Sequence, residues 1–248
     1  MIRVKNISKS FNGTQVLTDV SFDFLKGKTN LIIGQSGSGK SVLNKCMVGL
    51  YEADEGEIWY EGFNLTQAEK KEKRNLRKEI GMLFQGSALF DSLTVEENVM
   101  FPLDMFSDMS IEEKLDRANF CLTRVNLDDK NHMYPSELSG GMQKRVGIAR
   151  AIALNPNYLF CDEPNSGLDP KTSIVIDNLI KDITEEYDIT TVIITHDMNS
   201  VLEIGENICF IHEGQKWWEG NKEDILIAEN KELVDFVYAS DLMRRLKK

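Results

Sequence analysis

Four short, largely apolar runs recur along the chain, each followed by glycine or polar residues. They cover residues 29–33, 80–84, 158–161 and 191–195. Runs of this length without strict alternation are typical of parallel strands that are covered on both faces. A helical spacing of apolar residues over 172–186 lies between the last two runs. The pattern therefore predicts βαβ units around a buried sheet.

The N-terminal part has a different pattern. Alternating apolar positions in residues 1–26 flank Asn12-Gly13, a dipeptide that favours a two-residue hairpin turn, and a further strand is expected at 56–60. These segments predict an antiparallel β subdomain. Residues 67–78 are dominated by Glu, Lys and Arg, which indicates a helix with a solvated face.

Helical periodicity replaces strand signals over residues 94–154. It is clearest at 111–125 and 142–154. A helical stretch of this size inside a βαβ core predicts an inserted α-helical subdomain.

The last residues, 221–248, are expected to form a helical tail. Leu233, Phe236 and Val237 share one helical face in this segment, and residues 244–248 form a basic end. We expect that end to be a frayed terminus, with contact to lipid headgroups or to a second subunit as the alternatives.

Residues 34–41, GQSGSGKS, match the phosphate-binding pattern G-x-x-x-x-G-K-[ST]. Glycines allow such a loop to aim backbone N–H groups at phosphate oxygens, and the helix that follows adds a favourable dipole. Lys40 is expected to neutralise the β- and γ-phosphates, and the Ser41 hydroxyl to ligate Mg²⁺. The predicted nucleotide-binding residues of this loop are Gly34, Ser36, Gly37, Ser38, Gly39, Lys40, Ser41 and Val42. An apolar helix is expected after the loop, with Val42, Leu43, Cys46, Met47 and Leu50 as its apolar residues.

Two carboxylates follow the run at 158–161. In a sheet beside the phosphate loop, Asp162 should lie near the magnesium ion, and Glu163 should orient or deprotonate the water that attacks the γ-phosphate. His196 follows the run at 191–195 and, because strand ends converge on the ligand in such sheets, is expected to contact the γ-phosphate.

A second possible anion site is Leu138-Ser139-Gly140-Gly141-Met142, which opens a strongly patterned helix. Backbone N–H groups and a hydroxyl would point outward from this turn. Two separated phosphate-binding helix starts can enclose one nucleotide between two copies of the chain.

Composition restricts the function classes. The formal net charge of −11 argues against an electrostatic grip on nucleic acid, so no nucleic-acid partner is expected. The four cysteines are far apart in apolar contexts, which is typical of reduced core cysteines. No leader and no apolar stretch of about 18 residues is apparent, which predicts a cytoplasmic protein that reaches a membrane through a partner.

Together these motifs resemble the nucleotide-binding subunit of ABC transporters over residues 1–220. The motifs occur in the order that the family has: the phosphate loop, Gln85, LSGG, Asp162-Glu163, the segment Ser166-Gly167-Leu168-Asp169, and His196. The resemblance implies an α/β fold: a P-loop NTPase (RecA-like) core at 1–85 and 156–220, an N-terminal antiparallel β subdomain, and an inserted α-helical subdomain at 86–155. The whole chain, 1–248, would be one ABC ATPase domain with the tail at 221–248.

The resemblance also assigns roles. Phe11 would stack on adenine where relatives more often have Tyr, and Val16 would be a further nucleotide contact. Gln85 would contact magnesium and couple the site to the permease. The expected metal ligands are therefore Ser41, Gln85 and Asp162. Glu163, His196, Gln85 and Lys40 would be catalytic. Ser139, Gly140 and Gly141 would bind the nucleotide of the partner subunit. The chain departs from the family pattern at two positions: Met142 stands where most relatives have Gln, and Gly167 where Ala is more common.

Within the family, residues 84–95 together with LSGGM resemble the ATPase of Mla-type, MCE-associated phospholipid transport systems. This implies an ATP- and Mg²⁺-dependent homodimer on the inner face of the cell membrane, with permease subunits and an MCE-domain lipid-binding protein as partners. A different cargo, such as an amino acid, and a non-transport regulatory ABC ATPase are the alternatives.

A groove for a permease helix would need exposed apolar residues in the helical insertion. Packing within the insertion is the alternative role for the same residues. The residues considered are Leu89, Phe90, Phe101, Leu103, Met105 and Phe106.

Overall fold

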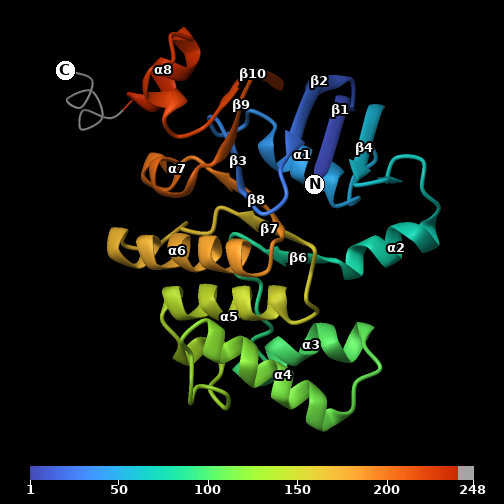
Figure 1. Cartoon of the computed structure of the whole chain (residues 1–248), viewed down its shortest axis with the longest axis vertical. Coiled ribbons are helices and arrows are strands. Elements are labelled where there is room, and N and C mark those ends of the chain that lie inside the picture. Colours follow the sequence, from blue (N-terminus) through green and yellow to red (C-terminus); the bar gives the residue numbers. More distant parts are fainter. Residues whose placement is uncertain (240–248) are drawn as a thin grey trace.

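Two β-sheets occupy the upper half of the molecule in Figure 1, and most of the helices lie beneath them. The computed structural model describes residues 1–239. The predicted basic end at 244–248 lies outside the described residues.

The larger sheet has six strands in the order β10-β9-β3-β8-β7-β6, parallel except for the antiparallel edge strand β10. The four predicted apolar runs form the adjacent strands β3, β8, β7 and β6, so their carboxyl ends meet at one edge. The sequence prediction missed β9 and β10. The strands are β3 Thr29–Ile33, β6 Ile80–Leu83, β7 Tyr158–Asp162, β8 Thr190–Thr195, β9 Asn207–His212 and β10 Gln215–Gly220.

The smaller sheet is antiparallel in the order β2-β1-β4-β5. Asn12 and Gly13 adopt positive φ of 50° and 81°, which forms the predicted hairpin turn between β1 and β2. Its strands are β1 Ile2–Phe11, β2 Thr14–Phe24, β4 Glu55–Tyr60 and β5 Phe63–Asn64.

Helix α1, Lys40–Met47, packs in a hydrophobic cluster that contains side chains from both sheets. Leu43, Cys46 and Met47 form the predicted apolar face. The prediction for Leu50 was wrong: it lies after the end of α1 and is 55% exposed. Helix α2, Lys70–Lys78, has one buried residue, Leu76, as expected for a solvated helix.

Three helices make up the insertion and lie at the bottom of Figure 1: α3 Val95–Phe106, α4 Ile111–Arg124 and α5 Gly140–Ile152. Reciprocal capping boxes start α3 at Thr94 and α4 at Ser110. Helix α6, Pro170–Glu186, lies between the insertion and the large sheet. The observed architecture confirms the expected α/β fold with an antiparallel subdomain and a helical insertion.

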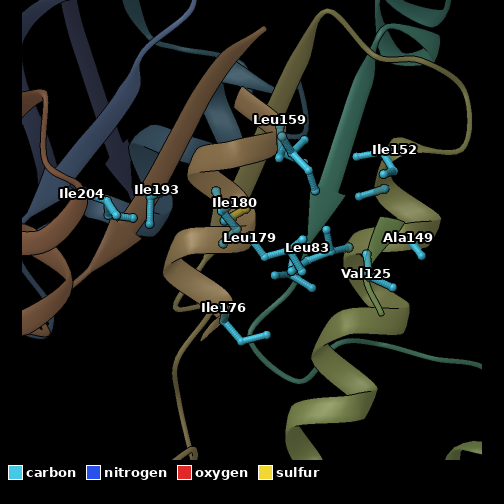
Figure 2. Close-up of a cluster of buried hydrophobic side chains, with 14 of the residues drawn as sticks. Leu83, Val125, Ala149, Ile152, Leu159, Ile176, Leu179, Ile180, Ile193 and Ile204 are labelled. Atoms are coloured by element: carbon cyan, nitrogen blue, oxygen red, sulfur yellow. The ribbon is translucent and has the colours of Figure 1, made fainter. Parts of the chain in front are cut away.

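A hydrophobic cluster joins the insertion to the sheet. Figure 2 shows Leu83 of β6 and Leu159 of β7 with side chains of α5 and α6 around them, including Ile152 and Ile180. All four are at most 2% exposed. The strand ends and the helix that begins at Gly140 are therefore held in one packed body.

The remaining described elements are short: α7 Met198–Ile204, α8 Lys231–Val237, and 3₁₀ turns at Pro135–Glu137, before α5, and at Asp224–Leu226. On α8, Leu233 and Val237 are buried, and Phe236 packs on Phe210 at 5.4 Å between ring centroids. Within residues 1–239, no helix combines the length and the apolar composition that crossing a bilayer requires. The boundaries 1–85, 86–155, 156–220 and 221–248 stay a prediction.

Candidate functional site

The phosphate loop lies between β3 and α1, at the carboxyl edge of the large sheet. Gly37 and Gly39 have φ of 80° and 102°, a conformation that glycine adopts without strain. A Cβ on Gly39 would approach Leu17 Cδ2 to 2.7 Å and Val16 O to 3.0 Å, whereas a Cβ on Gly37 would meet nothing within 4 Å. The loop is thus packed on the β2 side and open at Gly37.

Lys40 is 6% exposed, and its Nζ donates to the carbonyls of Gly34 and Gln35, both at 2.8 Å. Burial lowers the pKa of Lys40, and the nearby carboxylates of Glu163 and Asp162 act in the opposite direction. The ammonium therefore lies inside the loop, where a phosphate group would meet it. The buried Ser38 hydroxyl has no hydrogen-bond partner among the described residues, which leaves it available to a ligand.

The two carboxylates follow β7 as predicted. Glu163 has φ 49°, its N–H donates to Ile194 O at 2.9 Å, and its Oε1 lies 2.8 Å from Nδ1 of His196. Burial raises the pKa of Asp162, as does neighbouring Glu163, while the lysines nearby lower it. The predicted base and the predicted γ-phosphate contact thus form one hydrogen-bonded pair.

Gln85 follows β6, and its Nε2 donates to Ser166 Oγ at 3.3 Å. Its backbone carbonyl accepts a hydrogen bond from Lys144 of α5. Gln85 therefore contacts both the segment after β7 and the helical insertion.

These groups surround one cleft of about 1060 Å³. Gly34 and Ser38 are buried in the loop that forms its floor. The predicted site residues that line the cleft are Val16, Ser36, Gly37, Gly39, Lys40, Ser41, Val42, Gln85, Asp162, Glu163 and His196.

Apart from Gly34 and Ser38 of the loop, four predicted residues do not line this cleft: Phe11, Ser139, Gly140 and Gly141. Phe11 is 37% exposed and packs edge-on against Tyr51 at 5.2 Å. Ser139 caps α5 by accepting from Met142 N at 3.3 Å; Ser139 and Gly140 are exposed, and Gly141 is buried. The signature turn is thus outside the chain's own phosphate site, and its role toward a second subunit stays a prediction.

The sequence analysis missed several residues of the cleft wall. Asn165 lines it and donates to Asp177 Oδ1 at 2.8 Å and to Ser200 Oγ at 2.9 Å. Asp235 and Phe236 of α8 line it from the C-terminal side. The carboxylate–amide–hydroxyl network joins segments far apart in sequence, so spacing alone gave no signal for it.

The donor set agrees with Mg²⁺ bound together with nucleotide phosphates. Within residues 1–239, no group of three or more His, Cys, Asp or Glu side chains could hold a metal ion. The hydroxyl of Ser41, the amide of Gln85 and the carboxylate of Asp162 are oxygen donors of the kind that Mg²⁺ takes with phosphates and water. All four cysteines are buried and free, as expected of core cysteines.

The chain is similar in sequence to known ABC ATPases. The family model described as ABC transporter matches residues 17–166. The methionine import ATP-binding proteins MetN of Desulfitobacterium hafniense and Campylobacter jejuni are 41% and 39% identical to the chain; the alignments cover 98% of it and 73% and 77% of the relatives.

Solved structures agree. The ATP-binding cassette MJ0796, solved as a dimer bound to ADP and Pi, superposes with a TM-score of 0.81 at 34% identity, over 90% of this chain and 99% of that one. The cbiO1 protein of Clostridium perfringens, part of the transporter complex cbiONQ, gives a TM-score of 0.86 at 25% identity, over 100% of this chain and 98% of that one.

These relatives change the expected subfamily. The curated relatives compared above are methionine importers rather than phospholipid transporters, so they give no support to the lipid cargo or to an MCE-domain partner. They do support an ABC transporter ATPase that hydrolyses ATP with Mg²⁺. The chain belongs to the ABC transporter family as an ATP-binding subunit.

Proposed function

We propose that this chain forms a homodimer on the inner face of the cell membrane and drives a small-molecule importer by hydrolysing ATP. The observation that carries the proposal is the convergence of Lys40, Gln85, Asp162, Glu163 and His196 on one cleft beside the phosphate loop. This set supplies a cation for the phosphates, oxygen donors for Mg²⁺ and a carboxylate for the attacking water.

Each group has a distinct task in this proposal. Lys40 exchanges its loop carbonyls for the β- and γ-phosphates, and the N–H groups around Gly37 and Gly39 bind the same oxygens. Glu163 accepts the proton of the water, and His196 holds the Glu163 carboxylate in position. Mg²⁺ neutralises charge on the phosphates when bound.

The site needs a second copy to be complete. Ser139 and Gly140 are exposed at the start of α5, away from the chain's own cleft. A partner subunit can receive them over its γ-phosphate, where the hydroxyl and the helix N-terminus would stabilise the transferring charge. The dimeric form of the MJ0796 cassette supports such an arrangement.

A permease helix would bind on the insertion. Phe90, Met105 and Phe106 are exposed by 42%, 57% and 39%. Leu103 takes the alternative role, packing within the core, since it is 1% exposed. Leu89 and Phe101 are only partly buried, and Phe101 packs on Phe90 at 4.5 Å between ring centroids. The proposed permease surface therefore comprises Phe90, Met105 and Phe106 with Leu89 and Phe101 at its base.

An amino acid of the methionine type is the cargo that the relatives favour. A lipid cargo is the second candidate, because residues 84–95 resemble the phospholipid-transport ATPases. In this proposal the cargo is selected by the permease that this subunit recognises.

Substitution of Lys40 tests the ATPase proposal. Lys40→Ala removes the loop's buried cation, so it should weaken ATP binding and abolish turnover while leaving the far-UV circular dichroism unchanged. Normal hydrolysis by this variant would contradict the proposed site.

Purification of the complex from its native membrane tests the cargo. The permease that co-purifies with this chain is reconstituted in vesicles, and ATP-dependent uptake of labelled methionine and transfer of labelled phospholipid are measured side by side. Methionine uptake that is lost with Lys40→Ala supports the amino acid cargo, and lipid transfer without methionine uptake contradicts it.

A further inference from the structure

Helix α5 presents a polar stripe to the segment that follows β6. Lys144, Gly147 and Arg150 are three residues apart, so they lie on one face of the helix. Lys144 is 4% exposed, which is rare for a lysine unless its charge is bound by protein groups. A Cβ on Gly147 would lie 2.7 Å from Leu83 Cδ1, so the helix approaches β6 closely at this point.

The acceptors of this stripe are backbone carbonyls. Lys144 Nζ donates to the carbonyl of Gln85 and lies 3.5 Å from the carbonyl of Glu163. Arg150 donates from Nη2 to Ser87 O at 2.6 Å and from Nη1 to Ala88 O at 2.8 Å. The stripe thus binds the main chain after β6, and Lys144 alone of its two cations also reaches the main chain after β7.

Both of these segments have unusual backbone. Ser87, Ala88 and Glu163 have φ of 61°, 47° and 49°, in the left-handed region that non-glycine residues seldom adopt. Such conformations persist where surrounding contacts impose them. The hydrogen bonds from α5 are contacts of that kind.

We propose that Lys144 is a positioning residue that fixes Gln85 and Glu163 relative to each other and to the helix that begins at the signature turn. This positioning role rests on the proposed function, which assigns Gln85 and Glu163 their roles. Lys144 contacts their backbone carbonyls and does not line the cleft. Without it the Gln85 carbonyl loses a charge-assisted donor, and the two residues are no longer held by a common anchor.

The neighbouring Arg145 provides a matched control. Its Nη1 donates to Asn126 O at 2.9 Å, so it is also a cation on α5 with a carbonyl acceptor. That acceptor follows α4 and belongs to neither the segment after β6 nor the segment after β7. Lys144→Met and Arg145→Met therefore remove comparable hydrogen bonds at different places.

Steady-state ATPase kinetics form the first test. Lys144→Met should lower kcat by about tenfold to a hundredfold, because small misplacements of catalytic groups have effects of that size. KM for ATP should change by less than about twofold, since the phosphate loop is intact. Lys144→Gln, whose amide can donate to one carbonyl, should fall between wild type and Lys144→Met. Arg145→Met should keep its kcat.

Amide hydrogen exchange of the nucleotide-free protein forms the second test and does not depend on activity. Peptides that cover residues 84–89 should exchange faster in Lys144→Met than in wild type or Arg145→Met, and peptides from β3 should not change. If Lys144→Met does not fold, Lys144→Gln supports the same comparison.

Three results would overturn the positioning role: unchanged kcat in Lys144→Met, an equal loss in Arg145→Met, or unchanged exchange at 84–89. A wild-type protein that hydrolyses no ATP in its complex would instead contradict the proposed function. The exchange measurement would still decide the role of Lys144.

Discussion

Glu163 combines a left-handed backbone with two contacts to the end of β8, one from its N–H and one from its carboxylate. Its φ of 49° carries a strain of about 1–3 kcal/mol for a residue with a Cβ. The bond from its N–H to Ile194 O and the contact of its carboxylate with His196 oppose that strain. The carboxylate is therefore oriented by the protein itself, before any nucleotide binds.

Glu163→Gln should bind ATP yet hydrolyse it at least about a hundredfold more slowly, because an amide cannot accept the proton of the water. Uncleaved ATP should also keep two subunits together, which light scattering after size exclusion would detect. Glu112→Gln, the same change on the exposed face of α4, is the control. A Glu163→Gln variant with the control's turnover would remove Glu163 from the mechanism.

Asp177 predicts a pH effect on stability. Burial raises its pKa to about 6, although Asn165 and Ser200 donate to it and act in the opposite direction; Asp197 and Glu203 are the nearby acidic groups that raise it further. The folded protein therefore binds this proton more tightly than the unfolded chain does. Between about pH 4 and 6 this group makes stability fall as pH rises, by up to about 3 kcal/mol.

Asp177→Asn should remove that contribution. The free energy of unfolding of wild type minus that of the variant, measured by urea titration, should decrease from pH 4 to pH 6 and then level off. A difference that is constant over this range would contradict the raised pKa of Asp177.

Among the elements, α3 separates two roles that its sequence does not distinguish. Leu103 and Met105 are both large and apolar, but one is 1% exposed and packs in the core while the other is 57% exposed. Leu103→Ala should lower the free energy of unfolding by about 2–5 kcal/mol. Met105→Ala should change it by less than about 0.5 kcal/mol and should reduce the amount of permease that co-purifies. Equal stability losses would contradict this division of α3.

Local sequence patterns predicted the strands that consist of an uninterrupted apolar run. Runs such as 29–33 and 191–195 became neighbouring strands because an uninterrupted apolar run is covered on both sides. Strand β10 alternates exposed and half-buried residues at a sheet edge. Its largely polar sequence, QKWWEG, has no apolar run, so the strand was not predicted. Leu50 and Leu103 show the same limit: spacing identifies an apolar residue but not where a helix ends or which of its faces meets the core.

The site was predictable where chemistry depends on contiguous residues. The phosphate loop and Asp162-Glu163 are of this kind, and the structure brings them to one cleft with Gln85 and His196. Lys144 and Asn165 act through partners more than ten residues away. Two cations six residues apart in α5, Lys144 and Arg150, with Gly147 between them on a helix whose buried side is largely apolar, are the signal that could have identified Lys144.

At the scale of the whole molecule, the proposed function needs two subunits, because the phosphate loop lines the cleft and the signature turn of the same chain does not. Lys40 lies in the cleft, while Gly140 is exposed at the start of α5. A symmetric dimer would contain two composite sites, each with Lys40 of one protomer and Gly140 of its partner. Lesions in the two segments should therefore complement each other when variants are mixed.

The most direct test mixes Lys40→Ala with Gly140→Asp subunits in the assembled complex. Gly140 suits this purpose better than Gly141, because a Cβ at Gly140 would have one ordinary contact, 3.6 Å from Leu168 Cδ2, whereas at Gly141 it would clash with Thr172 at 2.5 Å. Each variant alone should hydrolyse almost no ATP. An equimolar mixture should recover about a quarter of the wild-type rate, since half of the dimers would hold one intact composite site. Wild-type turnover by Gly140→Asp alone, or a mixture no more active than its components, would contradict a shared ATPase site.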